Sequence, residues 1–415
     1  MTTHLDDTKE SFIAKIANVD VINRALLYQN NMVRAAKSDN PRFQRALRQG
    51  GASVVLLSLL AGCVSADSAP QTKRPAPSAP VFTPARAPHV AKPATIPPPA
   101  RPAANRAPVG LENLLEDQWR LFPGRTGVAI MRIDGGEWLT GKRQGELFPQ
   151  QSVSKTWVAL TILDLVDQGK VRLDQKVRIT RDDLAVFHQP VRDRVVANGE
   201  IEMSVLALLE QAIISSDNTA NDSLLRTAGG PQAIKEFLTR KKLGAIRFGP
   251  GERLLQSGIA GMDWRQEYSL GRNFYTARDA VPLAQRKAAL DRYLADPVDG
   301  ASPEAIVRAL ARLAKGELLS PASTKLILGI MSRTSSGPNR LKAGVPPTWR
   351  FMHKTGTGQI LPPVSTGYND IGIMTAPDGT RYAVAVMMGS TTSSIPQRMS
   401  FMQFVSRTVA TYHDQ

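Results

Sequence analysis

The sequence contains only one cysteine, Cys63, among 415 residues, so it cannot form an internal disulfide framework, a cysteine-based zinc site or an iron–sulfur cluster. Its five histidines lie far apart in the chain and form no H-x-H or H-x-x-x-H pair, which argues against a zinc hydrolase. We therefore predict a protein that works without a metal ion or another cofactor.

Runs of like charge and long apolar segments are also missing. The chain has 52 Lys and Arg against 36 Asp and Glu, a formal charge of +16, yet no five or six like charges follow one another. This argues against a nucleic-acid-binding tail, whereas the basic excess favours anionic surfaces and anionic substrates. The most apolar segment, residues 52–62, is too short to cross a bilayer as a helix.

That segment instead fits the apolar region of a signal peptide, because Arg42, Arg45 and Arg48 precede it. It runs into Leu60-Ala61-Gly62-Cys63, which resembles the lipobox of bacterial lipoproteins, where the cysteine is lipidated. The alternative is a buried core helix with a chance cysteine. We interpret residues 1–63 as an N-terminal extension and lipoprotein signal peptide; either Met32 is the true start or residues 1–31 are a cytoplasmic extension.

Residues 64–110 have the composition of a disordered tether. There are 12 prolines between Pro70 and Pro108, interleaved with Ala, Arg and Lys, and such a segment cannot form a packed core. At about 3.1 Å per residue in an extended form, the 39 residues from Pro70 to Pro108 reach on the order of 120 Å. We therefore expect a protein of the bacterial envelope, held in the periplasm by a lipid on Cys63. Val64 stands where an aspartate would favour inner-membrane retention, so the outer membrane is preferred.

The remaining residues, 111–415, are predicted to form one α+β domain. Strand-like runs lie at 126–140, 349–355, 367–374 and 381–388, with turns at Asp134-Gly135-Gly136 and Pro377-Asp378-Gly379. Helical patterns occur at 156–167, 204–214, 303–314 and 396–411, and the first is apolar nearly all round. Strands at both ends with helices between them indicate an antiparallel sheet built by the two termini, with an inserted helical region.

The first motif with chemical content is Ser152-Val153-Ser154-Lys155, at the start of the buried helix. Residues three apart lie on one helix face, so the Lys155 amine can reach the Ser152 hydroxyl. An amine in a poorly solvated site loses pKa and can accept the serine proton. The alternative is a capping serine followed by a surface lysine, but Lys155 interrupts an otherwise apolar helix.

Two further motifs follow in the chain. Ser216-Asp217-Asn218 comes directly after the helix at 204–214, and its simpler interpretation is a polar turn or helix cap. Lys354-Thr355-Gly356-Thr357-Gly358 lies on and after a predicted strand, and its simpler interpretation is an edge strand ending in a glycine turn. An ammonium, a hydroxyl and a glycine that admits a ligand to the backbone also make a good carboxylate site.

Together and in this order the three motifs are the signature of class A β-lactamases and penicillin-binding proteins. The chain from about Leu114 to Asp414 resembles the class A β-lactamase family in other segments too. These are Thr219-Ala220 with Gly229-Gly230-Pro231, Lys315-Gly316-Glu317-Leu318-Leu319, and Arg340-Leu341-Lys342-Ala343-Gly344-Val345-Pro346, which is similar to the family's R-x-R-A-G-L-P.

The family's deacylating glutamate lies 36 residues after the serine of the second motif, which here is Glu252 in Glu252-Arg253-Leu254-Leu255-Gln256. The arginine usually found two residues earlier is Pro250, so the ion pair that closes this loop is missing. The loop's closing Asp and Pro reappear as Asp299 and Pro303, after an insertion at 257–298. Glu267 is the second candidate for the glutamate.

The resemblance implies a serine acyl-transfer enzyme. Ser152 is the implied nucleophile and Lys155 its base or proton relay, with the backbone N–H groups of Ser152 and Thr357 as the oxyanion hole. Ser216 passes a proton to the leaving nitrogen and Glu252 activates the deacylating water. The substrate-binding residues implied are Asn218, Arg340, Lys354, Thr355, Gly356 and Thr357.

These roles fit a monomeric antibiotic-resistance enzyme that binds a small β-lactam or peptidoglycan-like substrate. Two alternatives stay open: a D,D-peptidase or penicillin-binding hydrolase with slow deacylation, and a non-catalytic envelope-anchored binding protein. The insertion 257–298 carries five aromatics, Trp264, Tyr268, Phe274, Tyr275 and Tyr293. Either they pack it against the helical region, or the insertion forms a wall of the active site.

Overall fold

The computed structural model describes residues 106–413. The predicted signal peptide, Cys63 and most of the predicted tether lie outside the described residues. Within them, the principal sheet has the order β2-β1-β10-β9-β7, and β8 pairs with β9. The strands are β1 (Arg125–Arg132), β2 (Trp138–Lys142), β3 (Phe148–Pro149), β4 (Lys176–Thr180), β5 (Glu200–Ser204), β6 (Gly300–Ala301), β7 (Arg350–Gly356), β8 (Ile360–Leu361), β9 (Val364–Thr375) and β10 (Arg381–Thr391).

The helices fill the segments between and around these strands. The α-helices are α3 (Val109–Leu121), α4 (Lys155–Asp167), α5 (Arg192–Asn198), α6 (Val205–Glu210), α7 (Asn218–Thr227), α8 (Pro231–Arg240), α9 (Glu252–Ile259), α10 (Asn273–Ala280), α11 (Leu283–Ala295), α12 (Pro303–Ala314), α13 (Pro321–Ser332) and α14 (Ile395–Thr411). Short turns of 3-10 helix are η1 (Gln151–Ser154), η2 (Arg181–Asp183), η4 (Gln266–Ser269) and η5 (Leu341–Gly344), and η3 (Gln211–Ser215) is a π-helical turn.

The sheet confirms the predicted α+β fold, because strands from the two ends of the domain pair with each other. Strand β1 pairs antiparallel with β10, with Ile130 opposite Val384. The predicted turn after β1 forms a hairpin with β2, and Gly135 and Gly136 both have positive φ, of 72° and 106°. Glycine adopts this backbone conformation without the cost that a side chain would add.

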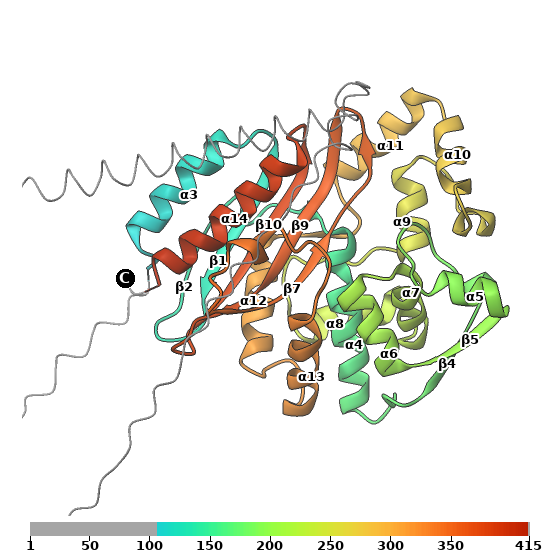
Figure 1. Cartoon of the computed structure of the whole chain (residues 1–415), viewed down its shortest axis with the longest axis horizontal. Helices are drawn as coiled ribbons and strands as arrows, with labels where there is room; N and C mark the ends of the chain where they lie inside the picture. Colours follow the sequence, from blue (N-terminus) through green and yellow to red (C-terminus); the bar gives the residue numbers. More distant parts are fainter. Residues whose placement is uncertain (1–105, 414–415) are drawn as a thin grey trace, which may run out of the picture. The chain divides into compact units, whose positions relative to one another are not determined.

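Helices cover both faces of the sheet, so its central strands β1, β9 and β10 are buried on both sides. Helices α3 and α14 lie side by side on one face, and α12 and α13 lie on the other (Figure 1). The inner residues of β1 are all buried, which matches a strand without a solvent face. Apolar clusters on the two faces hold the layers together.

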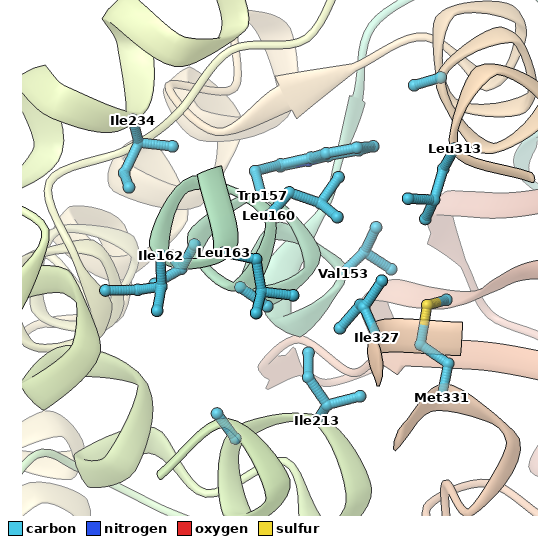
Figure 2. Close-up of a cluster of buried hydrophobic side chains, with 14 of the residues drawn as sticks. Val153, Trp157, Leu160, Ile162, Leu163, Ile213, Ile234, Leu313, Ile327 and Met331 are labelled. Carbon is cyan, nitrogen blue, oxygen red and sulfur yellow. The ribbon is translucent and has the colours of Figure 1, made fainter. Parts of the chain in front are cut away.

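Helix α4 lies at the centre of the larger cluster, as its apolar sequence predicts. Figure 2 shows Val153 and Trp157 among side chains of α12, α13 and the helical region, including Leu313, Ile327 and Met331. Trp157 has no exposed surface. The helix stops before Gly169, whose φ is 71°. This packing fixes the turn that carries Ser152.

The helical region also contains a two-stranded ribbon of β4 and β5, which the sequence analysis does not predict. The insertion adds η4, α10 and α11 beside α9 (Figure 1). Its aromatic residues pack in two clusters, one around Phe274 with Val186, and one that joins Tyr293 and Leu290 to Leu255 of α9. The predicted packing role of these aromatics is therefore present. None of the described helices is long and apolar enough to cross a membrane.

Candidate active site

The first motif lies where the 3-10 turn η1 leads into α4. Lys155 Nζ donates a hydrogen bond to Ser152 Oγ at 2.7 Å, and the lysine has no exposed surface. Residues i and i+3 eclipse each other in a 3-10 turn, which explains why the side chains meet. The residue before the serine, Gln151, has a positive φ of 54°. A non-glycine residue in this conformation needs support from its surroundings.

Glu252 reaches the same lysine from a different part of the chain. It is the first residue of α9, and its Oε1 accepts from Lys155 Nζ across 97 residues of sequence. Glu252 is 4% exposed, so the ion pair is buried. The other candidate, Glu267, is exposed and pairs with Arg265 at 3.1 Å. The structure therefore places Glu252, and not Glu267, beside the first motif.

A second buried carboxylate supports the start of α9. Asp222, on α7, accepts from the backbone N–H of Glu252 at 3.2 Å. Burial and the nearby Glu252 raise the pKa of Asp222 to about 6. The sequence analysis did not select Asp222, although its position four residues after Asn218 puts both on one face of α7.

The second motif joins the helical region to the sheet. Ser216 follows the π-helical turn η3 and adopts a left-handed conformation, with φ 64° and ψ 33°. Its Oγ accepts from Lys354 Nζ at 2.8 Å. Asp217 caps α7 by accepting from Ala220 N, so the simpler interpretation of this residue as a helix cap is also correct. Asn218 Nδ2 donates to Val186 O at 2.6 Å, which fixes its amide.

The third motif lies on β7, an edge strand of the sheet. Lys354 is fully buried and also donates to Thr355 O at 2.9 Å. Burial, with the nearby Lys155, holds the pKa of Lys354 well below its ordinary value. Gly356 packs so closely on the nucleophile turn that a Cβ would lie 2.4 Å from Gln150 O, so no other residue fits.

Arg340 lies behind this strand and holds its end. Its Nη1 donates to Gly356 O at 2.9 Å and its Nη2 to Thr357 Oγ1 at 2.6 Å. The guanidinium also stacks over the ring of Tyr368, 3.9 Å from its centroid. Ser336, which the sequence analysis did not select, places its Oγ 2.7 Å from Thr355 Oγ1. No pattern in the sequence around Ser336 singles it out.

The grouped side chains define the chemistry that this site can support. A serine touches a buried lysine, the lysine touches a buried carboxylate, and a second serine–lysine pair lies at the end of the sheet. Such a set supplies a nucleophile for an acyl-serine and the proton transfers that accompany its formation and hydrolysis. Among residues 106–413, no group of three His, Cys, Asp or Glu side chains is arranged to hold a metal ion. Fold and site therefore define a candidate serine hydrolase.

Comparison with known proteins gives the family. A family model described as the β-lactamase enzyme family matches residues 110–413. The chain belongs to this family and is a hydrolase of the β-lactamase type. It is 28% identical to β-lactamase VEB-1 of Pseudomonas aeruginosa over 292 residues, which is 70% of this chain and 85% of that protein. It is 26% identical to the extended-spectrum β-lactamase PER-1 of P. aeruginosa, over 63% of this chain and 74% of that protein.

Solved structures agree with this family. An ancestral class A β-lactamase is 30% identical with a TM-score of 0.58, and the match covers 72% of this chain and 99% of that one. A β-lactamase from Chitinophaga pinensis is 25% identical with a TM-score of 0.59, over 72% of this chain and 97% of that one. The resemblance inferred from the three motifs is thereby confirmed.

Proposed function

We propose that the protein is a serine β-lactamase that opens the β-lactam amide through an acyl-enzyme on Ser152. The observation that carries this proposal is the position of Lys155, whose buried Nζ contacts both Ser152 Oγ and Glu252 Oε1. One amine therefore connects the proposed nucleophile with the proposed base for deacylation. The β-lactamase names of the relatives support a β-lactam as the substrate.

In the acylation step, Ser152 Oγ attacks the amide carbonyl and forms the ester bond. Lys155 Nζ, 2.7 Å from Ser152 Oγ, accepts the serine proton as this bond forms. The backbone N–H groups of Ser152 and Thr357 are proposed to bind the oxyanion. The helix α4 begins just after Ser152, so its N-terminal dipole also favours negative charge there.

The carbon–nitrogen bond then breaks, and the leaving nitrogen needs a proton. Ser216 is the proposed donor, because its Oγ already contacts Lys354 Nζ at 2.8 Å. Burial lowers the pKa of Lys354, so its ammonium gives up a proton readily and can replace the proton that Ser216 passes to the nitrogen. The pair Ser216–Lys354 thus forms a second proton path, separate from Lys155.

Substrate orientation is assigned to groups on both sides of Ser152. Lys354, Thr355 and Arg340 are proposed to bind the substrate carboxylate, with Arg340 acting close to the Thr357 hydroxyl. Gly356 lets β7 pack directly against the nucleophile turn, which sets the distance between the strand and Ser152. Asn218 is proposed to hold the side-chain amide of the substrate on the opposite side, with its own amide oriented by Val186 O.

Deacylation decides between the two enzyme hypotheses. We assign Glu252 as the base that activates the hydrolytic water, because it is buried next to Lys155 at the first turn of α9. If Glu252 activates the water, the acyl-enzyme is hydrolysed and the protein acts as a β-lactamase with multiple turnovers. Otherwise the acyl-enzyme persists, and the protein behaves as a D,D-peptidase or a penicillin-binding hydrolase.

Nitrocefin hydrolysis combined with mass spectrometry of a penicillin adduct tests this proposal. We expect multiple turnovers by the wild type, a short-lived adduct on the peptide that contains Ser152, and neither adduct nor turnover with Ser152→Ala. A stoichiometric adduct without turnover would favour the D,D-peptidase alternative. Absence of both adduct and turnover would favour the non-catalytic binding protein. Equal labelling of wild type and Ser152→Ala would overturn the mechanism.

For location, we propose a monomer that is anchored to the outer membrane by lipid on Cys63 and faces the periplasm. The order of arginines, apolar segment and cysteine at residues 42–63 supports this proposal, as does the proline-rich composition of residues 64–110. Such an anchor keeps the enzyme where β-lactams enter the cell.

A further inference from the structure

Tyr293 of the insertion is tied to the residue before the proposed nucleophile. Its hydroxyl accepts from Gln151 Nε2 at 2.6 Å and donates to Asp299 Oδ1 at 2.9 Å. The other carboxylate oxygen of Asp299 accepts from Gln151 N at 2.8 Å. Tyr293 of helix α11 and Asp299, which directly follows the insertion, thus hold the side chain and the backbone of Gln151, whose φ is 54°.

Gln151 also contacts helix α9, which begins with the proposed deacylating residue Glu252. Its Oε1 accepts from Gln256 Nε2 at 2.9 Å, and the same amide nitrogen lies 3.4 Å from Glu252 Oε2. From the other side, Gln359 Nε2 donates to Gln256 O at 2.8 Å and to Gln256 Oε1 at 3.1 Å. Gln256 therefore has one orientation, with its oxygen toward Gln359 and its nitrogen toward Gln151 and Glu252.

These hydrogen bonds form a series in which each residue donates to the next: Gln359 to Gln256, Gln256 to Gln151, Gln151 to Tyr293, and Tyr293 to Asp299. Burial raises the pKa of Tyr293 well above its ordinary value, so the hydroxyl keeps its proton and donates. Asp299 is fully buried, and burial raises its pKa to about 6. The Asp299 carboxylate accepts hydrogen bonds from the Tyr293 hydroxyl and the Gln151 backbone N–H. In the family pattern an arginine at the position of Pro250 would form the ion pair that closes the loop.

We propose that Tyr293 and Asp299 are positioning residues for deacylation, which hold Gln151 and Gln256 so that Glu252 keeps the orientation needed to activate water. The insertion then does more than pack against the helical region: the Tyr293 hydroxyl takes the place of the missing ion pair that closes the loop between Glu252 and Asp299. This inference rests on the proposed function of Glu252. It assigns to the insertion an effect on the second chemical step and none on the first.

Tyr293→Phe tests this assignment. The phenyl ring keeps its place in the cluster with Leu255, Ile259 and Leu290, and only the hydroxyl is lost. We expect a deacylation rate constant at least tenfold below the wild type, with acylation changed less than twofold, from stopped-flow kinetics and adduct lifetimes. Tyr268→Phe is the matched control, because this tyrosine of the insertion packs with Trp264 and Phe274 away from the series, and it should keep wild-type rates.

Gln256→Met provides a second variant, should Tyr293→Phe not fold. It removes the amide at nearly constant volume and should slow deacylation selectively as well. Wild-type deacylation in a folded Tyr293→Phe or Gln256→Met variant, or an equal loss in both chemical steps, would overturn the positioning role while leaving the proposed function intact. If the wild type forms no acyl-enzyme at all, the proposed function and this inference both fail.

Discussion

Lys354 Nζ donates to Ser216 Oγ at 2.8 Å, although the two residues are 138 positions apart in the sequence. The contact joins an edge strand of the sheet to the end of a π-helical turn in the helical region. Ser216 has a left-handed backbone conformation and Lys354 is fully buried, so the surrounding packing restricts both side chains to this contact. The contact therefore fixes the proposed proton path at the junction of the two parts of the domain.

Ser216→Ala should slow acylation selectively. Loss of a positioned proton donor typically costs about 10²–10⁴-fold in rate, because the leaving nitrogen must take its proton from water. Stopped-flow measurement of acyl-enzyme formation should show this loss, and the rate of adduct decay should change much less. Ser215→Ala is the neighbouring control, since the Ser215 hydroxyl faces Gln211 O at 2.7 Å. Similar losses in both variants would contradict the role of Ser216.

Glu252→Gln should have the complementary effect. The amide cannot accept a proton from water, so we expect a burst of one equivalent of product followed by turnover about 10²–10⁴-fold slower. Mass spectrometry should find the acylated protein long after mixing. Glu267→Gln, which alters an exposed glutamate paired with Arg265, should leave turnover unchanged. If Glu252→Gln hydrolyses its adduct as fast as the wild type, another group activates the water.

Arg340→Ala should weaken the binding of substrates through their carboxylate. A hydrogen bond to a charged group contributes about 1.5–3 kcal/mol, so kcat/KM should fall by roughly 10–100-fold. The methyl ester of the same β-lactam lacks the anionic group and should show little difference between variant and wild type. Because Arg340 also holds Gly356 O and Asn369 O, an equal loss with acid and ester would mean that its role is structural.

Asp222→Asn should stabilise the protein at neutral pH. The folded-state pKa of Asp222 is about 6, above its ordinary value of 3.8, so the folded protein retains a proton that the unfolded chain has lost between these values. Stability from this group therefore declines as the pH rises from about 4 to about 6, and the ionised carboxylate is a cost above that range. The asparagine oxygen can still accept from Glu252 N, without the buried charge.

Urea unfolding at pH 5 and pH 7 measures this effect. We expect a free energy of unfolding about 1–3 kcal/mol higher than the wild type at pH 7, with a smaller gain at pH 5. Asp291→Asn, an exposed aspartate paired with Lys287, is the control and should not change the pH dependence. A variant that is less stable than the wild type at pH 7 would show that the carboxylate of Asp222 is needed at the start of α9.

Cys63→Ala should release the protein from the membrane. Without a thiol for lipidation, we expect the full-length protein to move from the outer-membrane fraction to the soluble periplasmic or unprocessed fraction. Ser65→Ala, which keeps the cysteine, should fractionate like the wild type. Unchanged fractionation of Cys63→Ala would leave the lipoprotein interpretation without support.

The sequence alone determined the features that depend on neighbours in the chain. The hairpin at Asp134-Gly135-Gly136, the buried helix after Ser152 and the strand that carries Lys354 all follow from local periodicity and turn chemistry. The family, too, could be recognised from the three motifs, because their residue types and order are specific even though each one alone is weak.

Only the tertiary structure decided which distant residues meet. Glu252 and Glu267 were both open as candidates, and the contact of Glu252 with Lys155 distinguishes them. The contact of Asp222 with the start of α9, and the contacts of Tyr293 and Asp299 with Gln151, cannot be derived from the sequence. A buried polar side chain forms hydrogen bonds with whichever groups the packing brings next to it. Packing brings together segments that are far apart in the chain, so their spacing in the sequence does not predict these contacts.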